Sequence, residues 1–408
     1  MSRFHRVCAV VLGGLLLGGA VFAQDWPQWR GVNRDGKVTG FTAPQAWPKT
    51  LEQQWKVKVG AGDASPVLVG EKLYVFACQD DQEMIYCLSA KDGAALWVDK
   101  YPAPPVTGPA SRHAGPRGTP AVAEGKVVTL GSTGIVSCID AATGQVLWTK
   151  DEFPKQYPMF FTAMSPLIVD GLAIVQLGGK DQGGIIAYEL ATGNVKWRWL
   201  EEGPEYASPA LMTVDGVKQL VTLTNKRVVG VSVADGKLLW SLPFVPEMRA
   251  YNAATPIIDG PTVIISGARR GTRAIYIERK GEVFLPREVW SNPDTAVQYN
   301  TPVLKDGLLY GLTDRGNLFC LNAKTGKTAW TDTAQTDRGG FCTLLDVGAA
   351  LLALPGSGEL IVFTPTDKAY TELARIKVAD TPTYASPVIA GNRIFVKDQD
   401  SVTLWLLK

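Results

Sequence analysis

The chain has 408 residues, of which 46% are hydrophobic, and it carries 41 lysines and arginines against 39 acidic residues. This composition is typical of a globular protein with a sizeable core. Its near-zero net charge provides no overall field that would attract nucleic acid or an anionic membrane. We therefore expect no nucleic-acid partner.

The first 23 residues have the pattern of a secretory signal peptide. Arg3 and Arg6 give a basic start, an apolar stretch rich in glycine follows, and Val21-Phe22-Ala23 offers small residues at a cleavage site. The stretch is too short for a membrane span, so we expect none. Cleavage before Gln24 leaves 39 basic and 39 acidic residues. The sequence predicts a periplasmic or secreted protein.

After residue 50 one unit returns eight times. Seven copies open with Ser-Pro or Thr-Pro and small or branched apolar residues, at 65–69, 119–123, 165–169, 208–212, 255–259, 301–305 and 386–390. A degenerate copy, FCTLL, stands at 341–345. Copies close with Asp-Gly or Thr-Gly and a tryptophan four positions beyond the glycine, at 92–97, 143–148, 192–197, 235–240 and 325–330. Such a period indicates a repeated supersecondary unit.

Each unit predicts four short antiparallel strands. In the first copy, SPVLVGEKLYVFAC gives two strands joined at Gly70-Glu71, and MIYCLSA and AALWVDK give the third and fourth. Alternation of period two and frequent turn signals are typical of a propeller blade. The turn glycine supplies the positive φ of a tight hairpin or bulge. The tryptophan on the outer strand then covers apolar area between neighbouring blades.

The tryptophans count the blades. Trp290 follows a longer turn, and Ile376 stands where the seventh copy should have its tryptophan. Trp55 has no Ser-Pro unit before it, while the last unit, 386–408, lacks an outer strand. The strand at 51–58 should therefore complete the last blade and close the ring without a free edge. The prediction is an all-β, eight-bladed β-propeller over 51–408, with a 24–50 extension packing on it.

The cysteines suggest packing rather than metal binding. Cys87, Cys138 and Cys320 share one repeat position, which favours a small buried side chain. Cys78 and Cys87 face one another if their hairpin turns at Gln82-Glu83, and export would permit a disulfide between them. No CxxC pair or His/Cys cluster predicts a metal site.

The loops that enter the innermost strands should share one face of the ring, which we call the loop face. Long loops over a rigid ring carry function in propellers. The longest, 98–118, holds His113, the only histidine after the signal peptide. Tyrosines precede several inner strands by two residues. The candidate binding residues at the channel mouth are Arg112, His113, Arg117, Tyr206, Arg249, Tyr251, Asn252, Tyr299, Asn300 and Tyr384.

Each of these residues also has a structural interpretation. The tyrosines can form a pocket for a flat or extended ligand, or they can pack against the neighbouring blade. Arg269, Arg270 and Arg273 can extend a basic region, or form a solvated turn that Glu201, Glu202 and Glu205 neutralise. His113 lacks a nucleophile partner, and the chain has no GxSxG or calcium-loop motif. We expect no catalytic residue and no metal ligand.

The turn motifs AxxTGxxxW resemble the PQQ-like, or quinoprotein-type, repeat, and DWPQWRGVNRDG at 25–36 resembles the start of exported bacterial propellers of that family. The resemblance implies an eight-bladed propeller, known both from PQQ-dependent alcohol dehydrogenases and from the lipoprotein BamB. It covers essentially the whole mature chain. It leaves the function open, because one propeller supports catalysis, binding and scaffolding alike.

Two functions compete. The resemblance to the dehydrogenases implies PQQ with calcium, held by a disulfide of adjacent cysteines, a tryptophan and Glu, Asn and Asp ligands. The chain has no adjacent cysteine pair and no CxxCH haem site. The BamB resemblance implies a non-catalytic, exported scaffold, which we expect to bind a protein, glycan or small anionic ligand on the loop face as a monomer. Unlike BamB, the chain shows no lipobox cysteine. We predict the scaffold, with the polyvinyl-alcohol type of dehydrogenase as the alternative.

Overall fold

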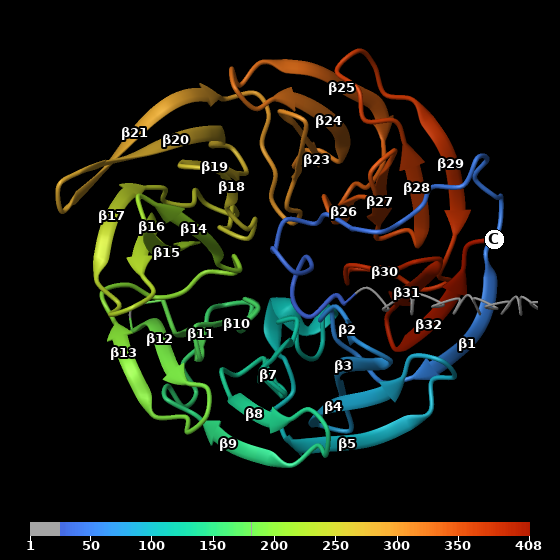
Figure 1. Cartoon of the computed structure of the whole chain (residues 1–408), viewed down its shortest axis with the longest axis horizontal. Coiled ribbons are helices and arrows are strands. Elements are labelled where there is room, and N and C mark those ends of the chain that lie inside the picture. The colour runs from blue at the N-terminus through green and yellow to red at the C-terminus, as the bar shows by residue number, and fades with distance from the viewer. Residues whose placement is uncertain (1–24, 181) are drawn as a thin grey trace, which may run out of the picture.

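Eight four-stranded antiparallel sheets surround a central axis, as Figure 1 shows. The computed structural model describes residues 25–180 and 182–408, so the predicted signal peptide lies outside the described residues. Within the described chain the only helix is a 3₁₀ turn, η1 (Gly108–Arg112), and no helix has the length and hydropathy to cross a membrane. The predicted eight-bladed propeller is confirmed.

Blades 1 to 4 follow one another along the chain. Blade 1 contains β2 (Val67–Val69), β3 (Lys72–Gln79), β4 (Gln82–Ser89) and β5 (Ala95–Pro102). Blade 2 contains β6 (Ala121–Ala123), β7 (Lys126–Leu130), β8 (Val136–Asp140) and β9 (Val146–Lys150). Blade 3 contains β10 (Leu167–Val169), β11 (Leu172–Gly178), β12 (Gly183–Glu189) and β13 (Val195–Trp199). Blade 4 contains β14 (Ala210–Val214), β15 (Val217–Leu223), β16 (Arg227–Ser232) and β17 (Leu238–Pro243).

Blades 5 to 8 complete the ring. Blade 5 contains β18 (Ile257–Asp259), β19 (Thr262–Gly267), β20 (Gly271–Lys280) and β21 (Val283–Asn292). Blade 6 contains β22 (Val303–Lys305), β23 (Leu308–Leu312), β24 (Asn317–Asn322) and β25 (Thr328–Gln335). Blade 7 contains β26 (Cys342–Asp346), β27 (Leu351–Pro355), β28 (Glu359–Phe363) and β29 (Glu372–Lys377). Blade 8 contains β30 (Val388–Ala390), β31 (Arg393–Lys397), β32 (Ser401–Leu406) and β1 (Glu52–Lys58).

The two ends of the propeller share blade 8, as the sequence predicted. The strand order is β1-β32-β31-β30, with Trp55 opposite Leu404 and Lys58 opposite Ser401. The strand that begins the propeller therefore supplies the outer strand that the last unit lacks. The chain closes through ordinary backbone hydrogen bonds, and its terminal strands leave no unpaired inner edge.

Outer-strand tryptophans fasten neighbouring blades to one another. The Nε1 atom of Trp148 donates to the Leu190 carbonyl oxygen of the next blade at 3.0 Å, and Trp197 makes the same bond to Val233 at 2.9 Å. Trp55, Trp97, Trp290 and Trp330 repeat it with Ala90, Ala141, Ala323 and Thr366. Gly193 lies against the Trp148 ring, where a Cβ would come within 2.7 Å, and its φ is +72°. The Thr-Gly turn thus needs glycine for both space and conformation.

Two blades depart from this arrangement. Blade 5 has no Thr-Gly turn for the tryptophan of blade 4 to contact. That residue, Trp240, donates instead to the side-chain oxygen of Gln219 in its own blade, blade 4. In blade 7 the tryptophan position is Ala374, which pairs with Val362 just before the bulge, and not Ile376. The predicted position was wrong by two residues because the turn before β29 has a different length. Residues two apart share one face of a strand, and on this face Ile376 is buried while Ala374 is partly buried.

The cysteines are all unpaired in the described chain. The β3–β4 hairpin turns at Asp80 and Asp81, so Cys78 lies opposite Glu83 and Cys87 lies opposite Tyr74. The possible Cys78–Cys87 disulfide is therefore wrong, because it required a turn at Gln82-Glu83. Cys87, Cys138 and Cys320 are buried in their blades, which is the packing role that their shared position indicated.

At five of the eight junctions between blades, the Ser or Thr before the inner strand joins one blade to the next at the axis. The backbone N–H of Ser65 donates to the Thr119 hydroxyl at 3.1 Å, and that of Thr119 donates to Ser165 at 3.0 Å. The same bond runs from Ser165 to Ser208, from Thr255 to Thr301 and from Ser386 to Ser65. These N–H groups precede the sheet ladder, so a hydroxyl of the next blade satisfies a buried donor.

Residues 25–38 cross the centre of the ring, where Figure 1 draws the chain in dark blue. This segment, which we call the hub, hydrogen-bonds to seven blades. Its contacts are Trp26 with Leu68, Pro27 with Val122, Trp29 with Thr255, Arg30 with Thr301 and Pro302, Arg34 with Ser165, Pro166 and Pro209, and Val38 with Asp346. Burial lowers the pKa of Arg30 to about 10 and that of Arg34 to about 9. Both guanidinium groups bond mainly to backbone carbonyl oxygens.

Replacing Trp148 or Trp197 with alanine should lower the free energy of unfolding by roughly 3–5 kcal/mol, because each buried ring fills the space between two blades. Urea unfolding monitored by circular dichroism measures the loss. Leu147→Ala is the matched control, since Leu147 lies beside Trp148 on β9 but is 41% exposed. A loss below about 1 kcal/mol in the tryptophan variants would contradict the inter-blade role.

Candidate functional site

One position recurs at the mouth of the central channel. It stands two residues before the axial Ser or Thr of each blade and is occupied by Asp63, Arg117, Ala163, Tyr206, Ala253, Tyr299, Phe341 and Tyr384. Each residue lies in a different loop between two blades, at the start of an inner strand. In the two loops that have alanine here, an aromatic side chain a few residues earlier, Phe160 or Tyr251, takes its place in the ring contacts described next.

Seven ring side chains form a continuous series of contacts around the axis, which we call the collar. Tyr299 stacks on Phe341 at 4.5 Å between ring centroids, with the ring planes 7° apart. The centroid distances in the series run from 4.5 to 6.5 Å, which is typical of attractive aromatic pairs. The other neighbours in the series are Phe160 with Tyr206 and Tyr251, Tyr206 with Tyr251, Tyr251 with Tyr299, and His113 with Phe341 and Tyr384.

Arg117 closes the collar between its two ends. Its guanidinium donates to the Phe160 carbonyl oxygen at 2.7 Å and to the His113 carbonyl oxygen at 2.6 Å. Burial lowers the pKa of Arg117, although Asp63 opposes that shift. Asp63 also lies 2.8 Å from Nδ1 of His113. His113 therefore has a carboxylate that orients its ring, but the contacts around it are aromatic and it has no nucleophile to activate.

The two long loops that carry these ends support one another. Val106 and Ala110 of the 98–118 loop pack with Phe161 of the next loop, and Tyr157 stacks on Phe161 at 4.4 Å. Phe161 has a φ of +64°, which is uncommon for a bulky residue. This small separate core holds Arg117 and Phe160 at the collar.

A cavity of about 110 Å³ lies inside the collar. Its lining includes Arg117, Tyr206, Tyr299, Asn300, Cys342, Thr343 and Tyr384 from the ring, and Trp29 and Arg30 from the hub. The collar therefore limits the cavity towards the loop face, and the hub limits it on the other side. Pockets for drug-sized ligands usually measure about 300–1,000 Å³. This cavity suits only a small molecule or ion.

The predicted asparagines make internal bonds. Asn252 is fully buried and donates to the carbonyl oxygens of Thr224 and Phe244, while its own oxygen accepts from Arg270. Asn300 exchanges two hydrogen bonds with the backbone of Leu312 and lines the cavity. Both amides fix the loops in which they lie.

The predicted arginines do not form one basic cluster. Arg112 ends η1 between blades 1 and 2, whereas Arg249 lies between blades 4 and 5 with a φ of +64°. Both are exposed on the loop face. Arg269 donates to the Met248 carbonyl oxygen, and Arg270 covers the Phe244 ring at 4.1 Å. Arg273 pairs with Glu288. Arg273 also lies over the Phe244 ring, at 5.8 Å, so Arg270 and Arg273 share that ring while Arg269 bonds elsewhere.

Glu205 is a titratable group beside the collar that lacks a full set of partners. Burial raises the pKa of Glu205 to about 7, although the backbone N–H of Asn252 and the charge of Arg270 oppose the shift. Its Oε2 atom and two nitrogen atoms of Arg270 are buried without hydrogen-bond partners. Glu205 therefore holds a proton near neutral pH more readily than an exposed carboxylate does.

The donors in the described chain do not match a PQQ and calcium site. No group of three His, Cys, Asp or Glu side chains among residues 25–180 and 182–408 is arranged to hold a metal ion. The cysteine that lines the cavity, Cys342, is unpaired, and the cavity of about 110 Å³ is smaller than the roughly 300 Å³ at which pockets for drug-sized ligands begin. The side chains around the axis do not fit this cofactor.

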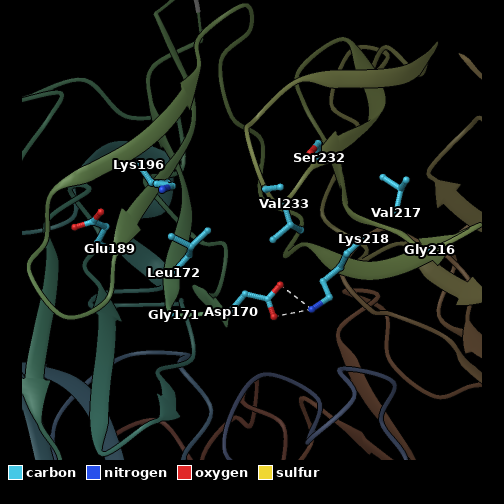
Figure 2. A pocket seen from close by; sticks show the side chains of 11 residues that line it. Asp170, Gly171, Leu172, Glu189, Lys196, Gly216, Val217, Lys218, Ser232 and Val233 are labelled. Carbon is cyan, nitrogen blue, oxygen red and sulfur yellow. Dashed lines mark hydrogen bonds and ion pairs between the residues drawn. The ribbon is translucent and has the colours of Figure 1, made fainter. Parts of the chain in front are cut away.

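A larger hollow of about 660 Å³ lies away from the collar, between blades 3 and 4, as Figure 2 shows. Hairpin turns of the two blades form its walls, and Asp170 meets Lys218 across it at 2.6 Å. Glu189 and Lys196 give it a second acid and a second base. Its charges balance, and none of the predicted site residues lines it.

Glu205→Gln should remove a pH dependence of stability between about pH 4.5 and 7. In this window the folded protein binds more protons at Glu205 than the unfolded chain does, so the free energy of unfolding of the wild type falls as the pH rises. The variant should gain up to roughly 3 kcal/mol relative to wild type at pH 8, and little at pH 4. Urea unfolding at pH 4, 6 and 8 measures this. Exposed Glu201→Gln is the control, and parallel profiles would contradict the assignment.

Known proteins share both the sequence pattern and the fold. The family model described as "Outer membrane protein assembly factor BamB" matches residues 15–162 and 110–332. BamB of Burkholderia pseudomallei is 24% identical over 371 residues, which is 86% of each chain, and BamB of Yersinia pestis is 22% identical over 67% of this chain and 69% of the relative. Quinohemoprotein alcohol dehydrogenase ADH-IIG of Pseudomonas putida is 29% identical over 158 residues, which is 36% of this chain and 21% of the dehydrogenase.

Solved structures agree on the fold. BamB from Moraxella catarrhalis aligns with a TM-score of 0.65 over 88% of this chain and 100% of its own, at 13% identity. A europium-containing methanol dehydrogenase aligns with a TM-score of 0.71 over 93% and 90%, at 14% identity. At such identities the structures establish the architecture alone. Since the family model matches well over half of the sequence, this chain belongs to the BamB family of PQQ-like β-propellers.

Proposed function

We propose that this protein is an exported, non-catalytic propeller that binds a partner protein on its loop face. The collar is the main structural support for this role. It gathers an aromatic or histidine side chain from seven loops into one layer over the axis, and the cavity inside it is too small for a drug-sized substrate. A rigid layer of aromatic side chains favours contact with a surface over entry into the channel.

Exposed apolar side chains favour one side of the loop face. Among loops between blades, the large exposed apolar residues of the described chain are Met159, Leu200, Val245, Met248 and Tyr299. They come from four consecutive loops, between blades 2 and 6. Met248 is 81% exposed and stands next to exposed Arg249. Methionine, tyrosine and arginine are enriched in protein interfaces.

The relatives support an interaction role without naming its partner. The sequence relatives reported above that match over most of both chains are named as outer membrane protein assembly factors. A protein partner is therefore favoured over a glycan or a small ligand as the main occupant of the loop face. Export is proposed from the N-terminal signal pattern of residues 1–23.

Placing a photo-crosslinking amino acid at Arg112, Arg249 or Tyr299 should trap the partner in cells, because these side chains are exposed on the loop face. The same label at Lys91 and Lys324, in exposed turns on the opposite face, is the matched control. Mass spectrometry of the adducts reads the result. Adducts of equal yield and identity from both faces would contradict a binding face.

Alanine at one of these three positions should reduce the yield of the partner crosslink formed by a photo-crosslinking residue at another of them. The melting temperature should stay within about 2 °C of wild type, as expected for exposed residues. Arg112 and Arg249 donate no side-chain hydrogen bond within the described chain. Tyr299 makes none either, but its ring stacks on Tyr251 and Phe341 and lines the cavity. An equal loss of stability in all three variants would show that the residues are structural.

The alternative function is that of a PQQ- and calcium-dependent alcohol dehydrogenase, which the partial match to ADH-IIG favours. The chemistry of the side chains around the axis does not favour it. Titration of the mature protein with PQQ, with and without calcium, should therefore leave the melting temperature and the quinone absorbance unchanged. A known PQQ enzyme in apo form is the positive control. Saturable, calcium-dependent stabilisation would restore the dehydrogenase.

A further inference from the structure

The charged residues that line the cavity inside the collar are all basic. Among its lining residues are two arginines, Arg30 from the hub and Arg117 from the collar, and no aspartate or glutamate. Carboxylates close to the lining residues have partners elsewhere: Asp63 is bonded to His113, Asp35 accepts from the Lys37 backbone, and Asp337, near Cys342 and Tyr384, accepts from the backbone of Gly339 and Gly356. The lining itself therefore carries positive charge and uncharged polar groups.

Three hydroxyl groups in the cavity lining have an O–H group that is free to donate a hydrogen bond. The oxygen atoms of Ser165, Ser208 and Thr301 already accept backbone N–H groups from the preceding blades. A hydroxyl that accepts a bond on its oxygen still has one proton to donate. None of these three donates to another atom of the described chain, and all three line the cavity.

Two further polar atoms at the cavity lack partners. Nε of Arg30 is buried and makes no hydrogen bond, although the other guanidinium nitrogen atoms of this residue donate to three carbonyl oxygens. The Thr343 hydroxyl is also buried without a partner. Unpaired buried donors are costly, so they indicate that an acceptor occupies the space.

The size of the cavity narrows the choice of acceptor. A volume of about 110 Å³ holds roughly four water-sized groups. A tetrahedral oxyanion has five heavy atoms and presents four acceptor oxygens to surrounding donors. Guanidinium groups form the strongest hydrogen bonds of this kind with oxyanions. Tyr299 lines the cavity and is 38% exposed, so it marks the side that communicates with solvent.

We propose that the cavity between hub and collar binds a small tetrahedral oxyanion of the phosphate or sulfate class, held by Arg30, Arg117 and the hydroxyl groups of the axial Ser and Thr residues. The bound anion joins the N-terminal segment to the loops on the opposite side of the ring. This site is independent of partner binding on the loop face, so either can fail without the other.

The test uses the mature protein and inorganic phosphate or sulfate at low millimolar concentration, with chloride at matched ionic strength as the control. Isothermal titration should show saturable binding of one oxyanion per chain and none of chloride. Comparing the affinity for phosphate with that for sulfate shows which of the two oxyanions the cavity prefers. Low concentrations are needed because both salts stabilise proteins nonspecifically when concentrated.

Variants locate the site. Thr343→Val removes the unpaired hydroxyl at nearly constant volume and should weaken binding roughly ten-fold, and Arg117→Met should weaken it roughly a hundred-fold. Thr331→Val, on the exposed outer strand β25, is the matched control and should bind like wild type. Thr343→Val keeps the test valid if Arg117→Met fails to fold, because no hydrogen bond holds its hydroxyl.

Crystals grown with selenate add a positional measurement, since anomalous scattering places the selenium directly. A peak between Arg30 and Arg117 is the expected result. The proposal is overturned if no saturable binding occurs, if Thr343→Val binds like Thr331→Val, or if selenate lies only outside the cavity. In each of these cases the cavity holds water that satisfies the same donors.

Discussion

The hydrogen bond from the start of one inner strand to the hydroxyl of the next blade is the constraint on which the axis depends. At five of the eight junctions it fixes the Ser or Thr of one blade against the next, as between Ser65 and Thr119. The residue two positions before the axial Ser or Thr must then project over the channel. Because this happens in successive blades, the side chains at that position lie together in one layer. The collar follows from this backbone arrangement, and the outer tryptophans hold the blades at the matching distance on the rim.

Both sides of the axis are closed by groups of different chemistry. Aromatic side chains meet on the loop face, where they cost little to leave partly exposed, and the hub inserts Arg30 and Arg34 from the other side. Carbonyl dipoles satisfy these guanidinium groups without a full countercharge, which is why their pKa falls on burial. Positive charge at the floor and hydroxyl groups in the wall give the cavity its preference for an anion.

The same ring serves proteins of unlike function. Its blades align with both BamB and a methanol dehydrogenase at similar TM-scores, so the fold cannot separate a scaffold from an enzyme. The side chains around the axis, rather than the blades, support the proposed binding role, because aromatic rings and Arg117 occupy the mouth of this channel.

The blades, their number and the closure by residues 51–58 could be predicted from the sequence, because each depends on local turn chemistry and on a repeated pattern. The sequence also placed three collar tyrosines through their spacing from the axial Ser or Thr. It missed Phe341 and Phe160, since the first lies in a degenerate copy and the second stands five residues before its serine. It also assigned the tryptophan position of blade 7 to Ile376 instead of Ala374, because residues two apart on a strand follow the same alternation of buried and exposed side chains. Three features could not be predicted from the sequence: Asn252 faces inward, Arg117 joins both ends of the collar, and the hub reaches the cavity. Each depends on contacts between segments that lie far apart in the chain and meet only when it folds.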